Sequence, residues 1–233
     1  MQQEFINIAA HELRTPAQTV LGYAELAMTD PSIEIKSFID AIYRNAFRIQ
    51  KLTKDLLDVT RIESHRLALN KINFDLKQII LHVIEDGTLK LLSEGRNNVK
   101  LEFKNEMKAG EDVGHRDDIF VHADKDRIMQ VISNLLDNAL KFTSEGVKSI
   151  AIAKRKGEEE MAVVNIQDTG SGIDPEIFPR LFTKFSSKSF SSTGLGLYIS
   201  KNIIETHGGK IWAQNNNGHG RCGATFSFSL PIG

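Results

Sequence analysis

Two long amphipathic segments near the N-terminus constrain the fold of this chain more than any other feature. In the first segment, apolar residues recur at alternating intervals of four and three positions, namely Ile6, Ala10, Leu13, Ala17, Val20, Ala24 and Ala27. This spacing is typical of a helical seam that packs against other helices. The run Thr29-Asp30-Pro31-Ser32 interrupts the pattern, because a helix does not readily continue into a proline. A similar pattern begins again at Ile35 and fades near Ile62.

These segments predict an all-α helical hairpin with two helices of about 25–30 residues each. Two helices alone do not close a core around so long a seam, so we expect a second copy of the chain to complete a four-helix bundle. The alternative is a monomeric hairpin that packs on the rest of the chain. We place this first domain, and the homodimer contact, at residues 1–66.

From about Leu67 onward the pattern changes to alternating strand and helix signals. Strands are predicted at 69–73, 98–104, 119–123, 147–155, 161–167, 209–214 and 223–230. Helices are predicted at 75–94, 124–142 and 195–207, the first two opened by Asp75 and Asp124. The order of these elements indicates an α+β domain over residues 67–233, with a mixed sheet and helices on one of its faces.

Composition narrows the classes of function. With 29 basic and 30 acidic residues, the chain has no broad attraction to nucleic acid or to an anionic membrane. The single cysteine, Cys222, forms no intrachain disulfide, which indicates a reducing compartment and a cytoplasmic location. No apolar run approaches the ~18 residues of a membrane span, so we expect no membrane contact by this part of the protein. Met1 lies only ten residues before His11, inside a helical pattern, so we expect a sensory portion upstream.

Residues 5–16, F-I-N-I-A-A-H-E-L-R-T-P, place a histidine, an acidic residue and a threonine close together on the first predicted helix. His11 is turned about 100° away from the seam, which directs its imidazole toward solvent. A neutral imidazole has a lone pair that can attack phosphorus. Glu12 is placed to hold the tautomer of the ring, and Thr15, one turn further on, to orient a water molecule. The alternative is an exposed polar helix face with an incidental proline, Pro16.

Asn134, Asn138 and Lys141 are spaced four and three positions apart, so they share one face of the predicted helix 124–142. Asparagine is a middling helix former, and two of them inside a helix cost stability without a gain in packing. Amide oxygens suit a hard cation such as Mg²⁺, and a lysine one turn away suits phosphate. This face therefore favours a metal and phosphate site, with a plain solvated helix face as the alternative.

Glycine-containing clusters follow in the second half of the chain. The segment 168–173, D-T-G-S-G-I, ends a predicted strand, and its aspartate can accept a hydrogen bond from an exocyclic amine such as that of adenine. Its glycines let the backbone approach a ligand closely, although D-x-G-x-G alone is often only a turn. The serine-rich segment 186–192 has no packing pattern and is typical of a mobile lid. It leads into T-G-L-G-L at 193–197, which opens a helix whose free N–H groups can receive phosphate.

Taken in this order, the motifs resemble the catalytic core of two-component sensor histidine kinases. H-E-L-R-T-P resembles their H box, N-L-L-D-N-A-L-K-F the N box, and D-T-G-S-G-I the G1 box. F-T-K-F is similar to the F box, T-G-L-G-L to the G2 box, and G-A-T-F to a G3-like end. The resemblance covers nearly the whole chain. The chain has neither a Walker A motif nor H-R-D, which argues against P-loop enzymes and Ser/Thr/Tyr kinases.

The resemblance implies a dimerisation and histidine-phosphotransfer domain at 1–66 and a two-layer ATP-binding domain of the gyrase/Hsp90-like type at 67–233. It implies ATP and Mg²⁺ as cofactors, with His11 as phosphoacceptor, Glu12 as its base and Asn138 as the Mg²⁺ ligand. The further nucleotide-binding residues that it implies are Asn134, Lys141, Phe142, Asp168, Gly170, Gly172, Ile173, Lys184, Gly194, Leu195, Gly196, Leu197 and Thr225.

The function that the resemblance implies is ATP-dependent autophosphorylation on His11, followed by phosphotransfer to an aspartate in the receiver domain of a response regulator. Glu12 and Thr15 are similar to a motif used in dephosphorylating that partner, which implies phosphatase activity as well. Two alternatives stay open: a gyrase-like or chaperone ATPase, and a non-catalytic docking scaffold. The H-E-L-R-T-P motif argues against the first of these. Asn138, Asp168 and the glycines argue against the second.

Overall fold

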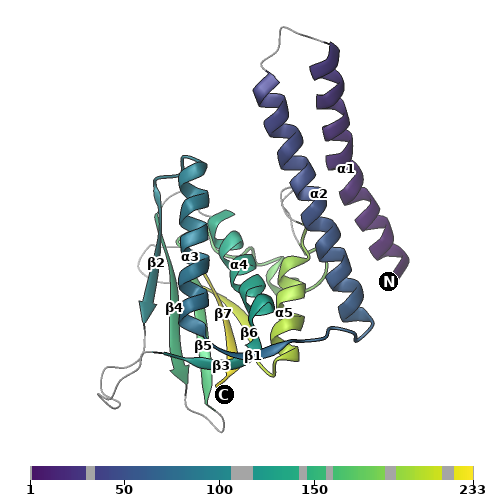
Figure 1. The fold of residues 1–233 in the computed structure, drawn as a ribbon. Helices are drawn as coiled ribbons and strands as arrows, with labels where there is room; N and C mark the ends of the chain where they lie inside the picture. Colours follow the sequence, from purple (N-terminus) through teal and green to yellow (C-terminus); the bar gives the residue numbers. More distant parts are fainter. Residues whose placement is uncertain are drawn as a thin grey trace. The chain divides into compact units, whose positions relative to one another are not determined.

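The computed structural model describes residues 2–29, 35–105, 118–141, 146–155, 160–186, 193–216 and 223–232 (Figure 1). The chain divides into two compact units. The first consists of Met1–Leu67 with Ser187–Leu195, and the second of Ala68–Ser186 with Gly196–Gly233.

The first unit contains the predicted helical hairpin. Helix α1 (Gln2–Thr29) and helix α2 (Ile35–Glu63) lie side by side along most of their length (Figure 1). Pro16 lies inside α1, and the rings of Tyr23 and Phe38 contact each other across the hairpin with their centroids 5.3 Å apart. The apolar spacing therefore predicted both helices at the positions where they occur. The predicted break at 29–32 lies, apart from Thr29, outside the described residues.

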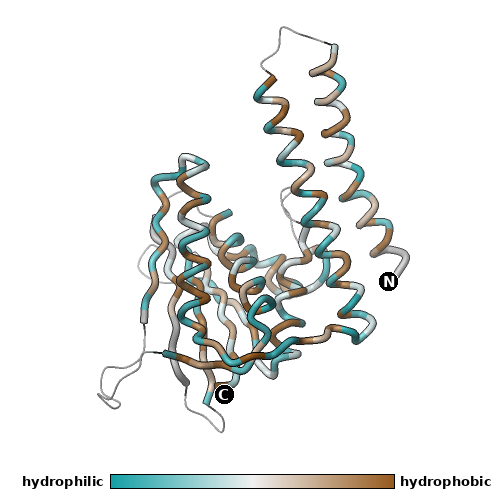
Figure 2. Tube along the Cα trace, in the orientation of Figure 1, coloured by the Kyte–Doolittle hydropathy of each residue, from teal (hydrophilic) through white to brown (hydrophobic). Residues whose placement is uncertain are grey.

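The packed face of α1 differs from the predicted seam. Ala9 and Pro16 are buried, whereas Ile6 and Ala10, which we assigned to the seam, are exposed. A hairpin gives α1 one neighbouring helix, so part of the apolar surface of each helix stays exposed. Figure 2 shows hydrophobic residues along both helices. The large apolar side chains exposed in this hairpin are Ile6, Leu21, Leu26, Met28, Ile35, Ile39, Tyr43, Phe47 and Leu57.

The second unit is built on a mixed five-stranded sheet. Its strands, in spatial order, are β2 (Val99–Asn105), β4 (Gly146–Arg155), β5 (Met161–Gln167), β7 (Ala224–Pro231) and β6 (Ile211–Asn215). The β2–β4 pair is parallel, and the other neighbours are antiparallel. Two further strands, β1 (Lys71–Asp75) and β3 (Phe120–Asp124), form a separate antiparallel ribbon.

Three helices cover one face of this sheet (Figure 1). They are α3 (Leu76–Ser93), α4 (Lys125–Lys141) and α5 (Gly196–Thr206), and a short 3₁₀ helix, η1, spans Phe178–Arg180. Asp75 caps α3 by accepting a hydrogen bond from the Lys77 N–H at 3.0 Å, and Asp124 accepts one from the Arg127 N–H at 3.1 Å. Both caps satisfy N–H groups of a first helical turn, which is why these aspartates predicted the helix starts.

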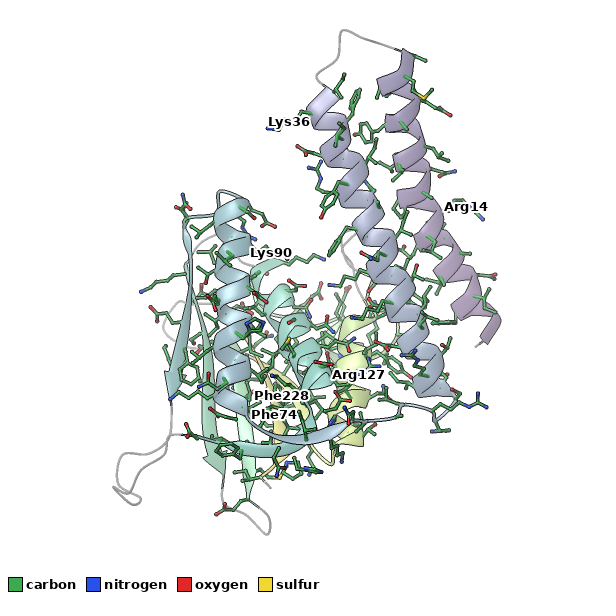
Figure 3. All side chains as sticks on the ribbon, in the orientation of Figure 1. Arg14, Lys36, Phe74, Lys90, Arg127 and Phe228 are labelled. Carbon is green, nitrogen blue, oxygen red and sulfur yellow. The ribbon has the colours of Figure 1, made fainter. Side chains whose placement is uncertain are left out.

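The core of the second unit lies between the sheet and the helices. Phe74 of β1 and Phe228 of β7 are buried in this unit (Figure 3). On α4, the apolar residues Ile128, Ile132, Leu135 and Ala139 are all buried. The sequence thus predicted the α+β architecture with its two layers. None of the helices in the described ranges is both long and apolar enough to cross a membrane.

Candidate functional site

His11 lies on the exposed side of α1, where its side chain keeps 73% of its surface accessible. Its Nδ1 atom is 3.9 Å from Glu12 Oε1, too far for a hydrogen bond but within reach after a small side-chain movement. The other Glu12 oxygen, Oε2, accepts a hydrogen bond from the Arg48 guanidinium of α2 at 3.1 Å. The carboxylate therefore lies between the imidazole of its own helix and a cation of the neighbouring helix.

Thr15 lies one helical turn after His11, as expected. Its Oγ1 donates a hydrogen bond to the His11 carbonyl oxygen at 3.3 Å. This hydrogen bond holds the Thr15 hydroxyl close to the helical turn that contains His11. Sequence reasoning missed Arg48, because nothing in the pattern of α2 distinguishes it from the other basic residues of that helix.

The polar face of α4 contacts the start of α5. Asn134 Nδ2 lies 3.5 Å from both the Gly196 carbonyl oxygen and Ser200 Oγ. Asn138 and Lys141 are half-buried on the same side of the helix. The predicted triad of side chains thus shares one face, and Asn134 joins it to the segment that opens α5. Phe142 lies outside the described residues.

The residues around Asn138 fit a Mg²⁺ ion that is bound together with a nucleotide. They do not fit a metal ion whose ligands all come from the protein. In the described part of the chain, no three His, Cys, Asp or Glu side chains gather as a metal-ligand set. Mg²⁺ commonly keeps several waters and takes only one or two protein ligands when phosphate oxygens supply the rest. A half-buried amide oxygen such as that of Asn138 suits this role.

Asp168 is buried directly after β5, and backbone groups hold its carboxylate. Its Oδ1 accepts hydrogen bonds from the Gly170 N–H at 2.8 Å and from the Ala224 N–H at 3.3 Å. Its own N–H donates to the Ala224 carbonyl at 2.9 Å. A Cβ at Gly223 would lie 2.3 Å from the Asp168 carbonyl oxygen, so only glycine fits there. The backbone therefore fixes the position of this carboxylate.

Asn215, the last residue of β6, and Asn216, the residue after it, brace the D-T-G-S-G-I loop, and sequence reasoning missed both. Asn215 exchanges hydrogen bonds with the backbone of Ile173, and Asn216 Nδ2 lies 3.4 Å from the Asp168 carbonyl oxygen. Gly172 has a φ of +79°, in the left-handed region that favours glycine. The run of three asparagines at 215–217 was the only sequence signal for this brace.

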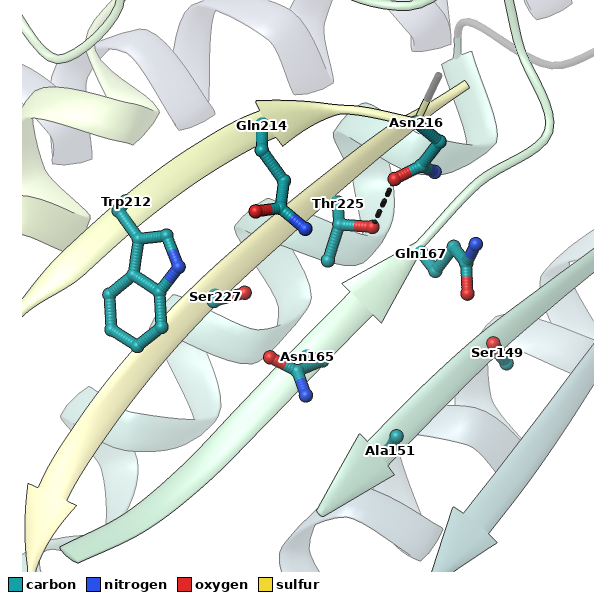
Figure 4. Close-up of a pocket in the computed structure, with 9 residues that line it drawn as sticks. All are labelled: Ser149, Ala151, Asn165, Gln167, Trp212, Gln214, Asn216, Thr225 and Ser227. Carbon is teal, nitrogen blue, oxygen red and sulfur yellow. Dashed lines mark hydrogen bonds between the residues drawn. The ribbon is translucent and has the colours of Figure 1, made fainter. Parts of the chain in front are cut away.

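Thr225, which the resemblance implies as a nucleotide-binding residue, lies on the strand next to Asp168. Thr225 pairs with Gln167 across β7 and β5, and its hydroxyl donates to Asn216 Oδ1 at 2.8 Å. Side chains alternate between the two faces of a strand, so Thr225 faces away from the helix-covered side where Phe226 is buried. There it lines a polar hollow of about 290 Å³ together with Asn165, Trp212 and other residues (Figure 4). The residue before Thr225, Ala224, forms hydrogen bonds with Asp168 through its backbone.

The remaining predicted residues lie around the start of α5. Gly194 has a φ of +65°, Leu195 is fully buried, and Gly196 and Leu197 form the first turn of α5. Lys184 Nζ lies 5.3 Å from the ring centroid of Tyr198, consistent with a cation–π contact. In the first unit, Thr193 Oγ1 donates a hydrogen bond to Asp55 Oδ2 at 3.0 Å. Most of the predicted serine-rich lid, 187–192, lies outside the described residues.

Two family models match the chain. Residues 1–65 match the His Kinase A (phospho-acceptor) domain. Residues 123–233 match the histidine kinase-, DNA gyrase B-, and HSP90-like ATPase. The two matches cover the hairpin and the part of the second unit that contains α4, Asp168 and α5.

Individual proteins and solved structures that are similar to this chain are also sensor proteins and histidine kinases. Sensor protein SrrB of Staphylococcus aureus is 32% identical over 242 residues, which cover 99% of this chain and 38% of SrrB. The catalytic domain of histidine kinase ThkA is 30% identical, with a TM-score of 0.56, over 70% of this chain and 96% of that domain. The Acinetobacter baumannii histidine kinase AdeS shares the fold, with a TM-score of 0.71 and 23% identity over 95% of this chain and 98% of AdeS. The chain spans well under half the length of SrrB.

Proposed function

Because this chain belongs to the sensor histidine kinases and contains both domains of their catalytic core, we propose that it phosphorylates its own His11 from ATP. We assign residues 1–66 to dimerisation and phosphotransfer and residues 67–233 to ATP binding. The observation that carries the proposal is the exposed imidazole of His11 beside a carboxylate, in a chain whose other unit presents a backbone-fixed Asp168.

The position of Glu12 supports different roles for the two ring nitrogens of His11. Glu12 lies on the Nδ1 side of the ring, so Nε2 is the nucleophile. Nε2 attacks the γ-phosphorus of ATP, the bond from that phosphorus to the β,γ-bridging oxygen breaks, and ADP leaves. The Nδ1 proton passes to Glu12, whose other oxygen stays paired with Arg48. The protein contributes positioning and charge neutralisation, as in phosphoryl transfer generally.

In the second unit, Asp168 accepts a hydrogen bond from the adenine amine, and Gly170, Gly172 and Ile173 lie against the base. Asn138 would hold Mg²⁺, which neutralises charge on the phosphates. Lys141, Lys184 and the first N–H groups of α5, together with the segment 194–197, would bind the phosphate oxygens. Asn134 supports this arrangement, because it connects α4 with the start of α5.

We further propose that the phosphoryl group passes to an aspartate in the receiver domain of a response regulator, and that Thr15 orients a water when the regulator is dephosphorylated. The exposed apolar side chains of α1 and α2 support a homodimer through residues 1–66. We place these reactions in the cytoplasm, where ATP is available.

Labelling with γ-³²P-ATP tests the proposal. His11→Ala should abolish acid-labile labelling and leave nucleotide binding intact, because the imidazole lies outside the ATP-binding unit. The matched control is His82→Ala, which changes another exposed histidine and should label like the wild type. Persistent labelling of His11→Ala would contradict the acceptor assignment. Steady ATP hydrolysis without phosphohistidine in the wild type would favour a gyrase-like or chaperone ATPase instead.

A further inference from the structure

The segment 168–173 is held at its far end by one side chain that sequence reasoning did not single out. We propose that Asn215 is a positioning residue that fixes the adenine-binding loop and thereby sets selectivity for the base. This inference rests on the proposed ATP site, in which Asp168 recognises the adenine amine.

Asn215 pairs with both backbone groups of a single residue. Its Oδ1 accepts a hydrogen bond from the Ile173 N–H at 2.6 Å, and its Nδ2 donates one to the Ile173 carbonyl at 3.1 Å. Only this orientation of the amide satisfies both groups, since the N–H needs an acceptor and the carbonyl needs a donor. The side chain therefore acts like the backbone of a neighbouring strand.

The close approach of Asn215 explains the residue before Ile173. A Cβ at Gly172 would lie 3.0 Å from Asn215 Oδ1, and Gly172 has a φ of +79°. A side chain at this position would both strain the backbone and push the amide away. Gly172 and Asn215 thus form one matched contact between the loop and the end of β6.

The two ends of the loop are anchored differently. At Asp168, backbone hydrogen bonds to Ala224 and the Asn216 amide hold the chain against β7 and β6. At Ile173, the hydrogen bonds seen within the described part of the chain both go to Asn215. Loss of Asn215 therefore frees the Ile173 end of the loop while Asp168 keeps its own partners.

Because Asn215 holds only the Ile173 end of the loop, its loss should affect recognition of the base and not phosphate binding. Asn215 is solvent-exposed, so it supports the loop from outside rather than contacting the base. A loosened Ile173 end lets the base shift relative to Asp168, which weakens recognition of the exocyclic amine. The phosphate-binding groups on α4 and α5 do not depend on this contact.

The test compares nucleotides that differ at that amine. Calorimetry would measure the affinities of the whole chain for ATP, for inosine triphosphate, which has a carbonyl in place of the amine, and for inorganic triphosphate, all with Mg²⁺. In the wild type we expect ATP to bind at least about tenfold more tightly than inosine triphosphate. Asn215→Ala should weaken ATP binding about three- to tenfold and reduce this preference, with triphosphate binding unchanged.

Two further variants make the result specific. Asn215→Asp is isosteric but replaces the Nδ2 donor with an oxygen, so it should lose base preference as Asn215→Ala does. Gln214→Ala changes the preceding exposed residue of β6 and should behave like the wild type. Thermal unfolding should show that all variants fold.

The outcomes separate this inference from the function on which it rests. If the wild type shows no preference for ATP over inosine triphosphate, the adenine site itself is wrong. If the wild type prefers ATP and Asn215→Ala keeps the same preference, the site stands and the positioning role is refuted. A parallel loss of triphosphate binding would also refute it, because the effect would then be general.

Discussion

At the residue scale, Glu12 has two competing neighbours. One oxygen lies 3.9 Å from the His11 imidazole, and the other is paired with Arg48 at 3.1 Å. Both side chains of the Arg48–Glu12 pair are partly buried, so the pair is screened less than a fully exposed one. Arg48 thus restricts the rotamers of the carboxylate that acts as base in the proposed reaction.

We therefore predict that Arg48→Ala slows phosphorylation of His11 by roughly three- to tenfold, the effect of losing an ion pair worth about 1 kcal/mol. Arg48→Lys should recover part of the rate, because it keeps the charge but not the planar fork. Single-turnover labelling measures the rate, and calorimetry should show unchanged ATP affinity. Arg44→Ala, which changes an exposed arginine one turn earlier, is the control. Equal rates for the two alanine variants would rule out the positioning role.

Asn138 provides a second prediction at this scale. Asn138→Ala should weaken Mg²⁺-dependent ATP binding by about tenfold or more, since among the residues that the structure describes no cluster of carboxylates replaces a lost amide ligand. Titration of ATP with and without Mg²⁺ checks this effect, and light scattering should show an unchanged oligomeric state. Ser133→Ala on the same helix serves as the comparison. An unchanged ATP affinity in Asn138→Ala would refute the metal role.

At the element scale, His207 joins the end of α5 to the start of α4. Its Nε2 accepts a hydrogen bond from the Asp124 N–H at 2.9 Å, and its Nδ1 donates one to the Ile203 carbonyl at 2.8 Å. Burial lowers the pKa of His207 below its ordinary value of 6.5 and outweighs the opposing hydrogen bond to Ile203. Of the charged neighbours, Lys71 also lowers this pKa, whereas Asp124 raises it. The neutral ring is therefore the form that holds the two helices together.

This lowered pKa predicts a loss of stability in acid. Below about pH 6.5 the histidine of the unfolded chain takes up a proton while the folded one resists it, so the unfolded state binds more protons. The contribution of His207 is complete above pH 6.5 and is lost as pH falls through the folded pKa. Urea unfolding between about pH 5 and 8 should show a shallower pH dependence in His207→Gln than in the wild type. His82→Gln, at an exposed histidine, is the comparison variant.

The hairpin shows the limit of a spacing argument at this same scale. The intervals of four and three located both helices, but the buried residues Ala9 and Pro16 lie next to the expected positions rather than on them. Residues adjacent in sequence differ by about 100° around a helix, so the buried positions show that the packed face is rotated from the predicted seam. Packing against α2 decided that rotation.

At the scale of the whole molecule, the first unit has more apolar surface than a single chain covers. Ile35, Ile39, Tyr43 and Phe47 follow one another at intervals of four along α2, and each is more than half exposed. Residues four apart form a ridge on a helix surface, which is the unit of helix packing. Such a ridge fits the helices of a second copy of this chain.

We predict that Ile39→Glu combined with Phe47→Glu converts a dimer into a monomer, because both charges would be buried between the copies. Light scattering after size-exclusion chromatography measures the mass. ATP binding should remain, since it belongs to the second unit. Leu89→Glu changes a leucine of similar exposure on α3 and should leave the mass unchanged. A wild type that is monomeric at micromolar concentration would favour the monomeric hairpin.

Features that depend on neighbours within a turn or two of the chain could be predicted from the sequence. Local spacing accounts for the helix spans, the Asp75 and Asp124 caps, the buried stripe of α4 and the order of the motifs. Contacts between residues far apart in the sequence became visible in the folded chain. Arg48 reaches Glu12 across 36 positions, Asn215 reaches Ile173 across 42, and Thr225 faces the side of the sheet that no spacing argument had assigned. Strand pairing and helix rotation, rather than local propensity, bring these side chains together, so a local pattern does not identify them.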